Sequence, residues 1–380
     1  MFKRLLSVML CLALLIPCAV MAEEDEEVFL MELYELDEEQ QAMWEEWDAA
    51  AEEVSEEDEE ATAEAMLDEL ELENAAEIDP SELDINPNLP DDWFNILLLG
   101  VDARKDVTDI GLSDVVMICS VHRETGEIKL TSIARDTAVT LPGYKNMNRI
   151  NTAYKFGGMN GEKNGIKDGG PKLAMRTVNY NFDMNIEKFV TVNFFGLAAI
   201  IDSIGGVDID LTKKEATRIN YELRKEPLDK VKRQPVEGVA GVHHLDGMQA
   251  VTFARIRGID NDFVRTSRQR KLLEVLLKQV IGDMNLIKMV ELMETALPYV
   301  YTNLTLEDMY TLGTTVLKSD IASKAANGEE VLRQHRIPMD KCFGYKDING
   351  ASMVWMNDKN FKLNKESIHK FIYGEVYGRN

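Results

Sequence analysis

The sequence predicts an α/β fold: a three-layer α/β/α domain with a central mixed sheet, preceded by a signal or anchor segment and an acidic low-complexity tract. From residue 93 onward, short apolar runs of strand length alternate with helical patterns. Such alternation is typical of a layered α/β domain rather than a sandwich or a helix bundle. The part of the 380-residue chain after the acidic tract has the size of one large domain.

Residues 1–22 are typical of an export signal. Two basic residues precede an apolar run at 5–22 that ends in small residues suited to cleavage. The run is near the lower length limit for a membrane span, and Pro17 would kink such a helix. We therefore expect an extracytoplasmic domain in the cell envelope. The sequence leaves open whether it is anchored by this segment or secreted after cleavage near Ala22.

The negative charge is confined to one segment. Residues 23–92 contain 31 acidic residues and no Lys or Arg, whereas residues 93–380 contain 40 basic and 36 acidic residues. Uncompensated charge at this density resists compaction. Residues 23–92 are therefore predicted to be a largely disordered or transiently helical spacer, and residues 93–380 to be the folded domain that would hold any functional site. An alternative is that the tract folds back over basic side chains of the domain. The net charge of −25 speaks against a nucleic-acid partner.

Three apolar runs predict the first strands. Residues 95–100 form a continuous apolar run that ends in glycine, and residues 115–121 and 128–134 flank a Glu-Thr-Gly turn. If this hairpin centres between Glu124 and Thr125, facing residues have numbers that sum to 249. A slip of one residue would move every side chain to the other face.

This register predicts a charged pair at the mouth of the hairpin. Asp114 would lie opposite Arg135, beside Asp102 at the end of the first strand. The later part of the chain continues the alternation of elements. Strands are expected at 189–193, 207–211 and 251–257, and helices at 171–180, 194–203, 243–250 and 265–281.

The densest group of arginines begins in the last predicted strand. On that strand Arg255 and Arg257 would share a face about 7 Å apart, which is unfavourable unless an anion covers them. At helical spacing Arg265, Arg268 and Gln269 share a face in the helix that follows. Guanidinium groups converging near a helix start suit a pyrophosphate. For Arg268, a solvated basic helix face is an equal alternative.

Asp102 and Asp114 predict a magnesium site. Two carboxylates at strand ends beside a phosphate site are the ligands through which Mg²⁺ bridges protein and pyrophosphate oxygens. Taken alone, such residues are more often turn formers, so the metal interpretation depends on the arginines nearby. The sequence lacks P-loop, dinucleotide-binding, zinc-protease and nucleophile-elbow motifs. Outside the leader, Cys119 and Cys342 are expected to be unpaired.

From about residue 93 to residue 373 the chain resembles the LytR-CpsA-Psr family of bacterial envelope phosphotransferases. The resemblance rests on four stretches in order: LLLGVD (97–102) with Asp114, SIARDT (132–137), RINTAYKFGG (149–158), and ARIR (254–257) with DFVRTSRQR (262–270). One departure stands at Leu112, where the family often has an arginine.

The resemblance implies transfer of a phosphoglycosyl polymer, such as teichoic acid or capsular polysaccharide, from a polyprenyl-pyrophosphate carrier to peptidoglycan. It implies Mg²⁺ as cofactor and work at the membrane surface. A hydrolase with the same site and a non-enzymatic lipid-pyrophosphate binder or envelope regulator are the alternatives. By match, Asp102 and Asp114 hold the metal, and the catalytic residues are Asp102, Arg135, Arg255 and Arg257. The pyrophosphate-binding residues are Arg135, Arg149, Arg255, Arg257, Asp262, Arg265 and Gln269.

Overall fold

The structure is a computed structural model. It describes residues 78–102, 108, 110–225, 233–256, 268, 271–272, 275–276, 297–319, 324, 332–348 and 350–378. The predicted signal segment, the acidic tract up to residue 77, and Arg257, Asp262, Arg265 and Gln269 lie outside the described residues. Within the described ranges, no helix combines the length and the apolar character needed to cross a membrane.

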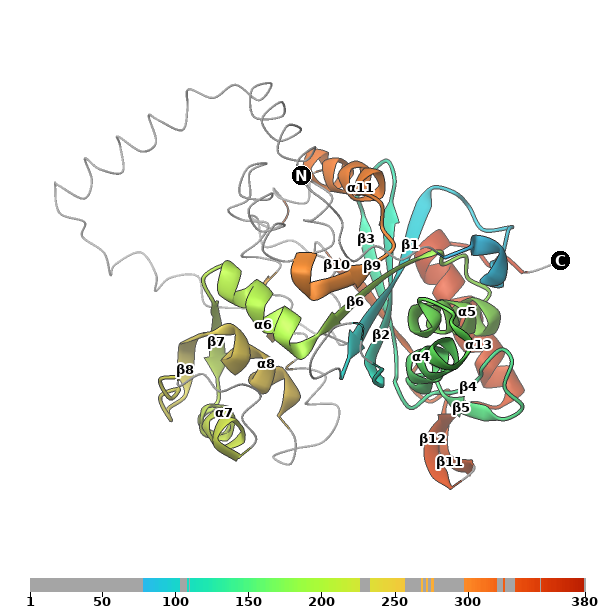
Figure 1. The fold of residues 1–380 in the computed structure, drawn as a ribbon. Helices are drawn as coiled ribbons and strands as arrows, with labels where there is room; N and C mark the ends of the chain where they lie inside the picture. Colours follow the sequence, from blue (N-terminus) through green and yellow to red (C-terminus); the bar gives the residue numbers. More distant parts are fainter. Residues whose placement is uncertain are drawn as a thin grey trace.

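A six-stranded mixed sheet forms the centre of the fold (Figure 1), in the order β10-β3-β2-β1-β6-β9. The central strand β1 pairs antiparallel with β2 and parallel with β6, and all of its residues are buried. The continuous apolar run of β1 is explained by this burial on both faces. The six strands are β1 (Trp93–Val101), β2 (Ser113–His122), β3 (Ile128–Ile133), β6 (Lys188–Asn193), β9 (Val300–Thr302) and β10 (Leu332–Ile337).

Helices cover both faces of this sheet, so it separates two apolar cores. Alternate residues of β1 point to opposite sides: Ile96 and Leu98 belong to one core, and Leu97 and Leu99 to the other. The first core includes residues of α6 (Phe194–Ser203), α8 (Gly247–Arg255) and α11 (Leu306–Lys318). The second includes residues of α4 (Thr152–Asn164), α5 (Gly169–Phe182) and α13 (Asp358–Tyr373). The predicted mixed α/β fold with a central mixed sheet is confirmed.

The remaining short elements decorate the domain. They are β4 (Ala138–Thr140) paired with β5 (Met147–Arg149), β7 (Val207–Leu211) paired with β8 (Gly241–Leu245), β11 (Gly344–Ile348) paired with β12 (Ala351–Trp355), α7 (Lys213–Lys225), and the 3-10 turns Pro80–Glu82 and Leu297–Tyr299. Cys119 and Cys342 are both free, as predicted.

The prediction was wrong for residues 243–256. The expected helix at 243–250 begins as strand β8, and the expected strand from residue 251 is the second half of helix α8. Asp246 caps α8 and forms a capping box with Gln249, a local signal that starts a helix. The apolar run after it was mistaken for a strand because a short, fully buried run has no period that separates strand from helix.

The packed part of the domain begins before residue 93. Leu83 and Leu89, at the end of the predicted spacer, are buried. The Asn86 side chain donates to the carbonyl oxygens of Asp183 at 3.1 Å and of Tyr377 at 3.2 Å. The segment 78–92 is thus held against α5 and the C-terminal segment of the domain, and it does not behave as spacer.

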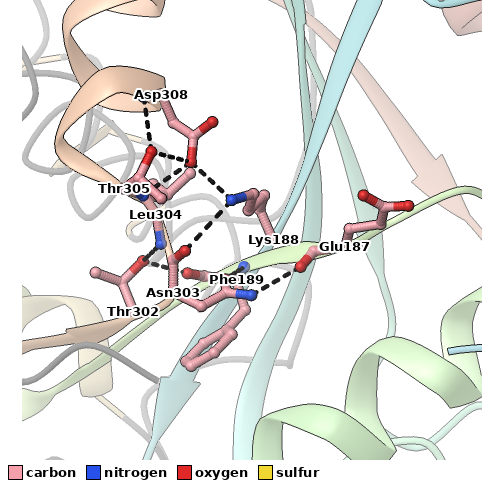
Figure 2. A network of polar contacts seen from close by, with 8 residues as sticks. All are labelled: Glu187, Lys188, Phe189, Thr302, Asn303, Leu304, Thr305 and Asp308. Carbon is pink, nitrogen blue, oxygen red and sulfur yellow. Dashed lines mark hydrogen bonds and ion pairs between the residues drawn. The ribbon is translucent and has the colours of Figure 1, made fainter. Parts of the chain in front are cut away.

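One polar network joins the start of β6 to α11 (Figure 2). Lys188 Nζ donates to Asp308 Oδ2 at 2.7 Å, and Asp308 forms a capping box with Thr305 at the start of α11. Asn303 accepts a hydrogen bond from the Phe189 amide at 2.9 Å. These contacts fix the turn between β9 and α11 against β6.

This network predicts a pH dependence of stability. Burial raises the pKa of Asp308, but hydrogen bonds from Lys188 and Thr305 outweigh burial and hold that pKa below its ordinary value of 3.8. A lowered pKa stabilises the folded state at neutral pH, and this contribution is lost as pH falls below about 4 through the folded-state pKa. Asp308→Asn is expected to lower the unfolding free energy at pH 7 by about 1–2 kcal/mol.

Urea unfolding of the variant and the wild type between pH 3 and pH 7 checks this expectation. The difference between the two proteins should shrink towards the acid end, and a difference that is constant across the range would contradict it. Asp340→Asn is the control, because the Asp340 side chain is 83% exposed and an exposed ion pair contributes little.

Candidate functional site

The candidate site lies where the carboxyl ends of β1, β3 and β6 meet the start of β2. Val101, the last residue of β1, pairs with Ser113 on one side and with Asn193 on the other. Asp102 and Asp114 therefore leave neighbouring strands at the same edge. We call this edge of the sheet the site edge.

The predicted hairpin register is confirmed, and it brings the expected charges together. Val116 pairs with Ile133 and Met117 with Ser132, so the facing numbers sum to 249. Arg135 Nη1 lies 2.9 Å from Asp114 Oδ1, with the two side chains 27% and 26% exposed. This ion pair holds a guanidinium at the mouth of the hairpin, accessible to a ligand.

The charges continue beyond this pair as an alternating row. Asp136 Oδ2 lies 3.6 Å from Arg135 Nε, and Asp136 Oδ1 lies 3.4 Å from Arg149 Nε. We call Asp114, Arg135, Asp136 and Arg149 the charged row. Because two cations alternate with two anions, the row is neutral overall. Its guanidinium groups are oriented before a ligand arrives, which lowers the cost of binding a phosphate, whose oxygens accept two hydrogen bonds from a planar guanidinium.

Backbone hydrogen bonds hold the turn that carries Arg135. The Asn151 amide donates to the Arg135 carbonyl at 3.2 Å, and the Ile150 amide donates to the Thr137 carbonyl at 2.9 Å. Asn151 precedes α4 without a side-chain capping bond. Its Oδ1 is buried and has no hydrogen-bond partner in the part of the chain that the structure describes. The site edge therefore also contains a buried acceptor oxygen beside the charged row.

Arg255 lies near the site edge on the side of the core that includes α6, α8 and α11. Its guanidinium carbon lies 3.9 Å from the centre of the Phe194 ring. Phe194 directly follows Asn193, the residue that pairs with Val101 at the site edge. Arg255 is the last residue of α8, not of a strand. The predicted shared strand face with Arg257 is therefore wrong, but the position of Arg255 over the Phe194 ring places a third guanidinium near the site edge.

The structure thus brings together Asp102, Asp114, Arg135, Arg149 and Arg255 around one edge. Asp102 is exposed and its amide donates to the Leu112 carbonyl at 3.1 Å. Leu112, which stands where an arginine was expected from the family pattern, is itself partly exposed.

Arg268 is a structural residue. Its side chain is 2% exposed, and its Nε donates to Glu215 Oε1 at 2.8 Å. Its Nη1 donates to the Ile256 carbonyl. The sequence left two roles open for Arg268: a solvated helix face, or contact with a bound pyrophosphate. A guanidinium that is buried against the carboxylate of Glu215 fits neither role.

Sequence reasoning missed Asp136. It lies inside the SIARDT stretch, yet only its neighbour Arg135 was assigned a role. The structure shows that Asp136 links Arg135 to Arg149. An acidic residue adjacent to a functional arginine was the available signal.

The carboxylates at the site edge fit a magnesium ion shared with a ligand. No group of three or more His, Cys, Asp or Glu side chains suited to a metal occurs among the described residues. Mg²⁺ is, however, often held by one or two carboxylates together with substrate phosphates rather than by an all-protein cage. Asp102 and Asp114 supply such a pair, and one oxygen of Asp114 is engaged by Arg135.

The fold and the site edge define an α/β protein with arginines and carboxylates gathered at one end of its central sheet. The chain belongs to the LytR_cpsA_psr family, whose model matches residues 57–369.

Relatives and solved structures agree with this assignment. Three proteins named polyisoprenyl-teichoic acid–peptidoglycan teichoic acid transferase TagU are similar to this chain. The one from Oceanobacillus iheyensis is 32% identical over 224 residues, which is 58% of this chain and 62% of the relative. The one from Enterococcus faecalis is 28% identical over 60% of this chain and 66% of the relative. The one from Bacillus cereus is 30% identical over 70% of this chain and 74% of the relative. The chain thus spans just under two thirds of the length of the first two relatives.

Two solved structures share the fold. TagV of B. subtilis superposes with a TM-score of 0.53 at 22% identity, covering 76% of this chain and 100% of that chain. A structure described as TagT bound to LI-WTA gives 0.51 at 21% identity, covering 78% of this chain and 94% of that chain. At these identities the likeness concerns the fold alone.

Proposed function

We propose that the protein transfers a phosphoglycosyl polymer, such as teichoic acid or another wall or capsular polysaccharide, from a polyprenyl-pyrophosphate carrier to peptidoglycan. The observation that carries the proposal is the charged row at the site edge, together with Arg255, which lies over the Phe194 ring next to the end of β6. Family membership and the names of the TagU relatives support it. The protein would work outside the cytoplasm, in the cell envelope and at the membrane surface.

The proposed reaction is an attack of an acceptor sugar hydroxyl on the sugar-linked phosphorus of the donor. The new bond joins that hydroxyl oxygen to phosphorus, the bond from this phosphorus to the bridging oxygen breaks, and polyprenyl phosphate leaves. Arg135, Arg149 and Arg255 are placed to neutralise charge that builds up on the leaving phosphate. Catalysis then consists mainly of positioning and electrostatic stabilisation.

Asp102 has two candidate roles in this scheme. It is exposed at the site edge, so it can accept the proton of the acceptor hydroxyl. It is alternatively, with Asp114, a ligand for Mg²⁺, which when bound would neutralise further phosphate charge. Arg257, Asp262, Arg265 and Gln269 remain proposed pyrophosphate-binding residues by their match to the family.

The test uses the full chain with Mg²⁺, a polyprenyl-pyrophosphate-linked glycopolymer and peptidoglycan. The expected product is polymer covalently linked to peptidoglycan, with release of polyprenyl phosphate. Release of free polymer phosphate with no linkage would indicate a hydrolase. Binding of the lipid without turnover would indicate a binder or regulator, and either result would overturn the proposal.

Replacement of Arg255 tests the donor site separately. Arg255→Ala is expected to weaken binding of polyprenyl pyrophosphate by about tenfold, because one charge-assisted hydrogen-bonding group is lost. Arg218→Ala is a matched control, since Arg218 also lies over an aromatic ring, that of Tyr221 at 4.9 Å, but on α7. Affinities measured by tryptophan fluorescence that are equal for Arg255→Ala and wild type would remove Arg255 from the site.

A further inference from the structure

The β11–β12 ribbon is attached to the charged row rather than to the main sheet. The Val354 amide donates to the Asp136 carbonyl at 2.9 Å, and Val354 forms a parallel bridge with Thr137. Arg149 Nη2 also donates to the Ser352 carbonyl at 2.7 Å. Two members of the charged row, Asp136 and Arg149, thus hold the backbone of β12 directly. In Figure 1 the ribbon projects from the body of the domain beside β4 and β5.

The ribbon presents aromatic rings to solvent. Tyr345 is 71% exposed, and its ring meets the ring of Phe343 edge to face with centroids 6.0 Å apart. On the alternate positions, Lys346 Nζ lies 4.9 Å from the centre of the Trp355 ring. Because strand residues alternate between faces, Phe343 and Tyr345 share one face and Lys346 and Trp355 lie towards the other. Among the tyrosines whose side chains the structure describes, Tyr345 is the most exposed.

Tyr345 is close to the site edge. It pairs directly with Val354, and the Val354 amide in turn donates a hydrogen bond to the carbonyl oxygen of Asp136. Tyr345 therefore lies two strand spacings, about 10 Å, from the backbone of Asp136. One sugar residue bound on Tyr345 would span much of the distance to the charged row.

The two sides of the site edge differ in chemistry. On the α6 and α8 side, Phe194 and Phe195 are only partly buried and adjoin a large apolar core, which suits the apolar carrier of a lipid-linked donor. On the ribbon side, aromatic rings are mixed with exposed Lys346, Asp347 and Ser352. A pyranose ring has an apolar C–H face and polar hydroxyls at its rim, and this mixture of rings and polar groups matches both.

We propose that the β11–β12 ribbon binds the glycan strand of the acceptor, with Tyr345 as its stacking platform. The inference rests on the proposed function, since it assigns the second substrate of that reaction to a surface. The acceptor then approaches the charged row from the ribbon while the donor lies on the α6 and α8 side. Arg149, bonded both to Asp136 and to Ser352, joins the two substrate regions.

In the experiment, soluble peptidoglycan glycan strands from which the peptides have been removed are titrated into the full chain, and calorimetry measures their binding. Tyr345→Ala is expected to bind the strands roughly fivefold more weakly, the loss of one aromatic stacking contact, and Tyr345→Phe should retain most of the affinity. Affinity for polyprenyl pyrophosphate should not change. Tyr180→Ala is the matched control, because Tyr180 is 49% exposed but lies on α5.

The outcomes separate this proposal from the proposed function. Equal glycan affinity for Tyr345→Ala and wild type, or no glycan binding by wild type, overturns the acceptor platform, while covalent transfer of polymer to peptidoglycan would still support the transferase. Glycan binding that depends on Tyr345, with no donor binding, keeps the platform and removes the transferase. A wild-type dimer that Tyr345→Ala converts to a monomer in sedimentation would show that a second copy occupies the ribbon, and would also overturn the proposal.

Discussion

Replacement of Arg135 by alanine is expected to reduce polymer transfer about a hundredfold or more. Arg135 is bonded to Asp114 at 2.9 Å and lies beside Asp136, so its loss leaves two carboxylates of the charged row with Arg149 as their one remaining cation in the row. Repulsion between those carboxylates and a pyrophosphate adds to the loss of a stabilising guanidinium. The measurement is the initial rate of transfer at saturating donor and acceptor.

The stability of this variant should change little. The Arg135–Asp114 pair is about one quarter exposed, and such pairs contribute about 1 kcal/mol or less. Arg333→Ala serves as the control, since Arg333 also pairs with a carboxylate, Glu127 at 3.3 Å, but at an exposed position of β10. Transfer within threefold of wild type in Arg135→Ala would contradict a role for the charged row in catalysis.

The largest stability change is expected from Arg268→Ala. Arg268 is almost fully buried and pairs with Glu215, whose side chain is 13% exposed. Burial raises the pKa of Glu215, but hydrogen bonds from Thr212 and Arg268 outweigh it, so the pKa lies below the usual value. Glu215 is therefore ionised, and removal of Arg268 leaves its buried carboxylate without a guanidinium partner. The expected loss of unfolding free energy is about 3–5 kcal/mol, measured by urea unfolding.

A double variant separates burial from pairing. Arg268→Leu combined with Glu215→Leu removes both charges and retains apolar volume, and it should recover most of the stability lost by the single variant. If the double variant is as unstable as Arg268→Ala, the cost arises from lost packing rather than from the unpaired carboxylate. A single variant as stable as wild type would return Arg268 to a surface role.

Local pattern was sufficient for much of the fold and for one half of the site. The continuous apolar run of β1 required burial on both faces, and the Glu124–Thr125 turn set the hairpin register by which Asp114 meets Arg135. These features depend on residues close together in the chain, where a turn and a period of two determine the partners.

Other features depended on packing between distant segments. Residues 251–255 were expected to be a strand because a buried run carries no period, although the capping box at Asp246 is a local signal for the helix that they form. Helical spacing predicted which residues share a face with Arg268. It did not predict that Glu215 of α7 packs against the Arg268 side chain. Only the fold could assign that arginine to the interior.

The sequence by itself determined that the chain holds a mixed α/β domain with acids and arginines at strand ends, because apolar runs, turns and residue types are written locally. The tertiary structure alone decided that Asp136 joins Arg135 to Arg149, and that Ser352 from near the C-terminus meets the same guanidinium. Such contacts arise where β5 and β12 pack beside the turn after β3. No short-range pattern records which distant segments will meet, because their encounter is set by burial of the whole core.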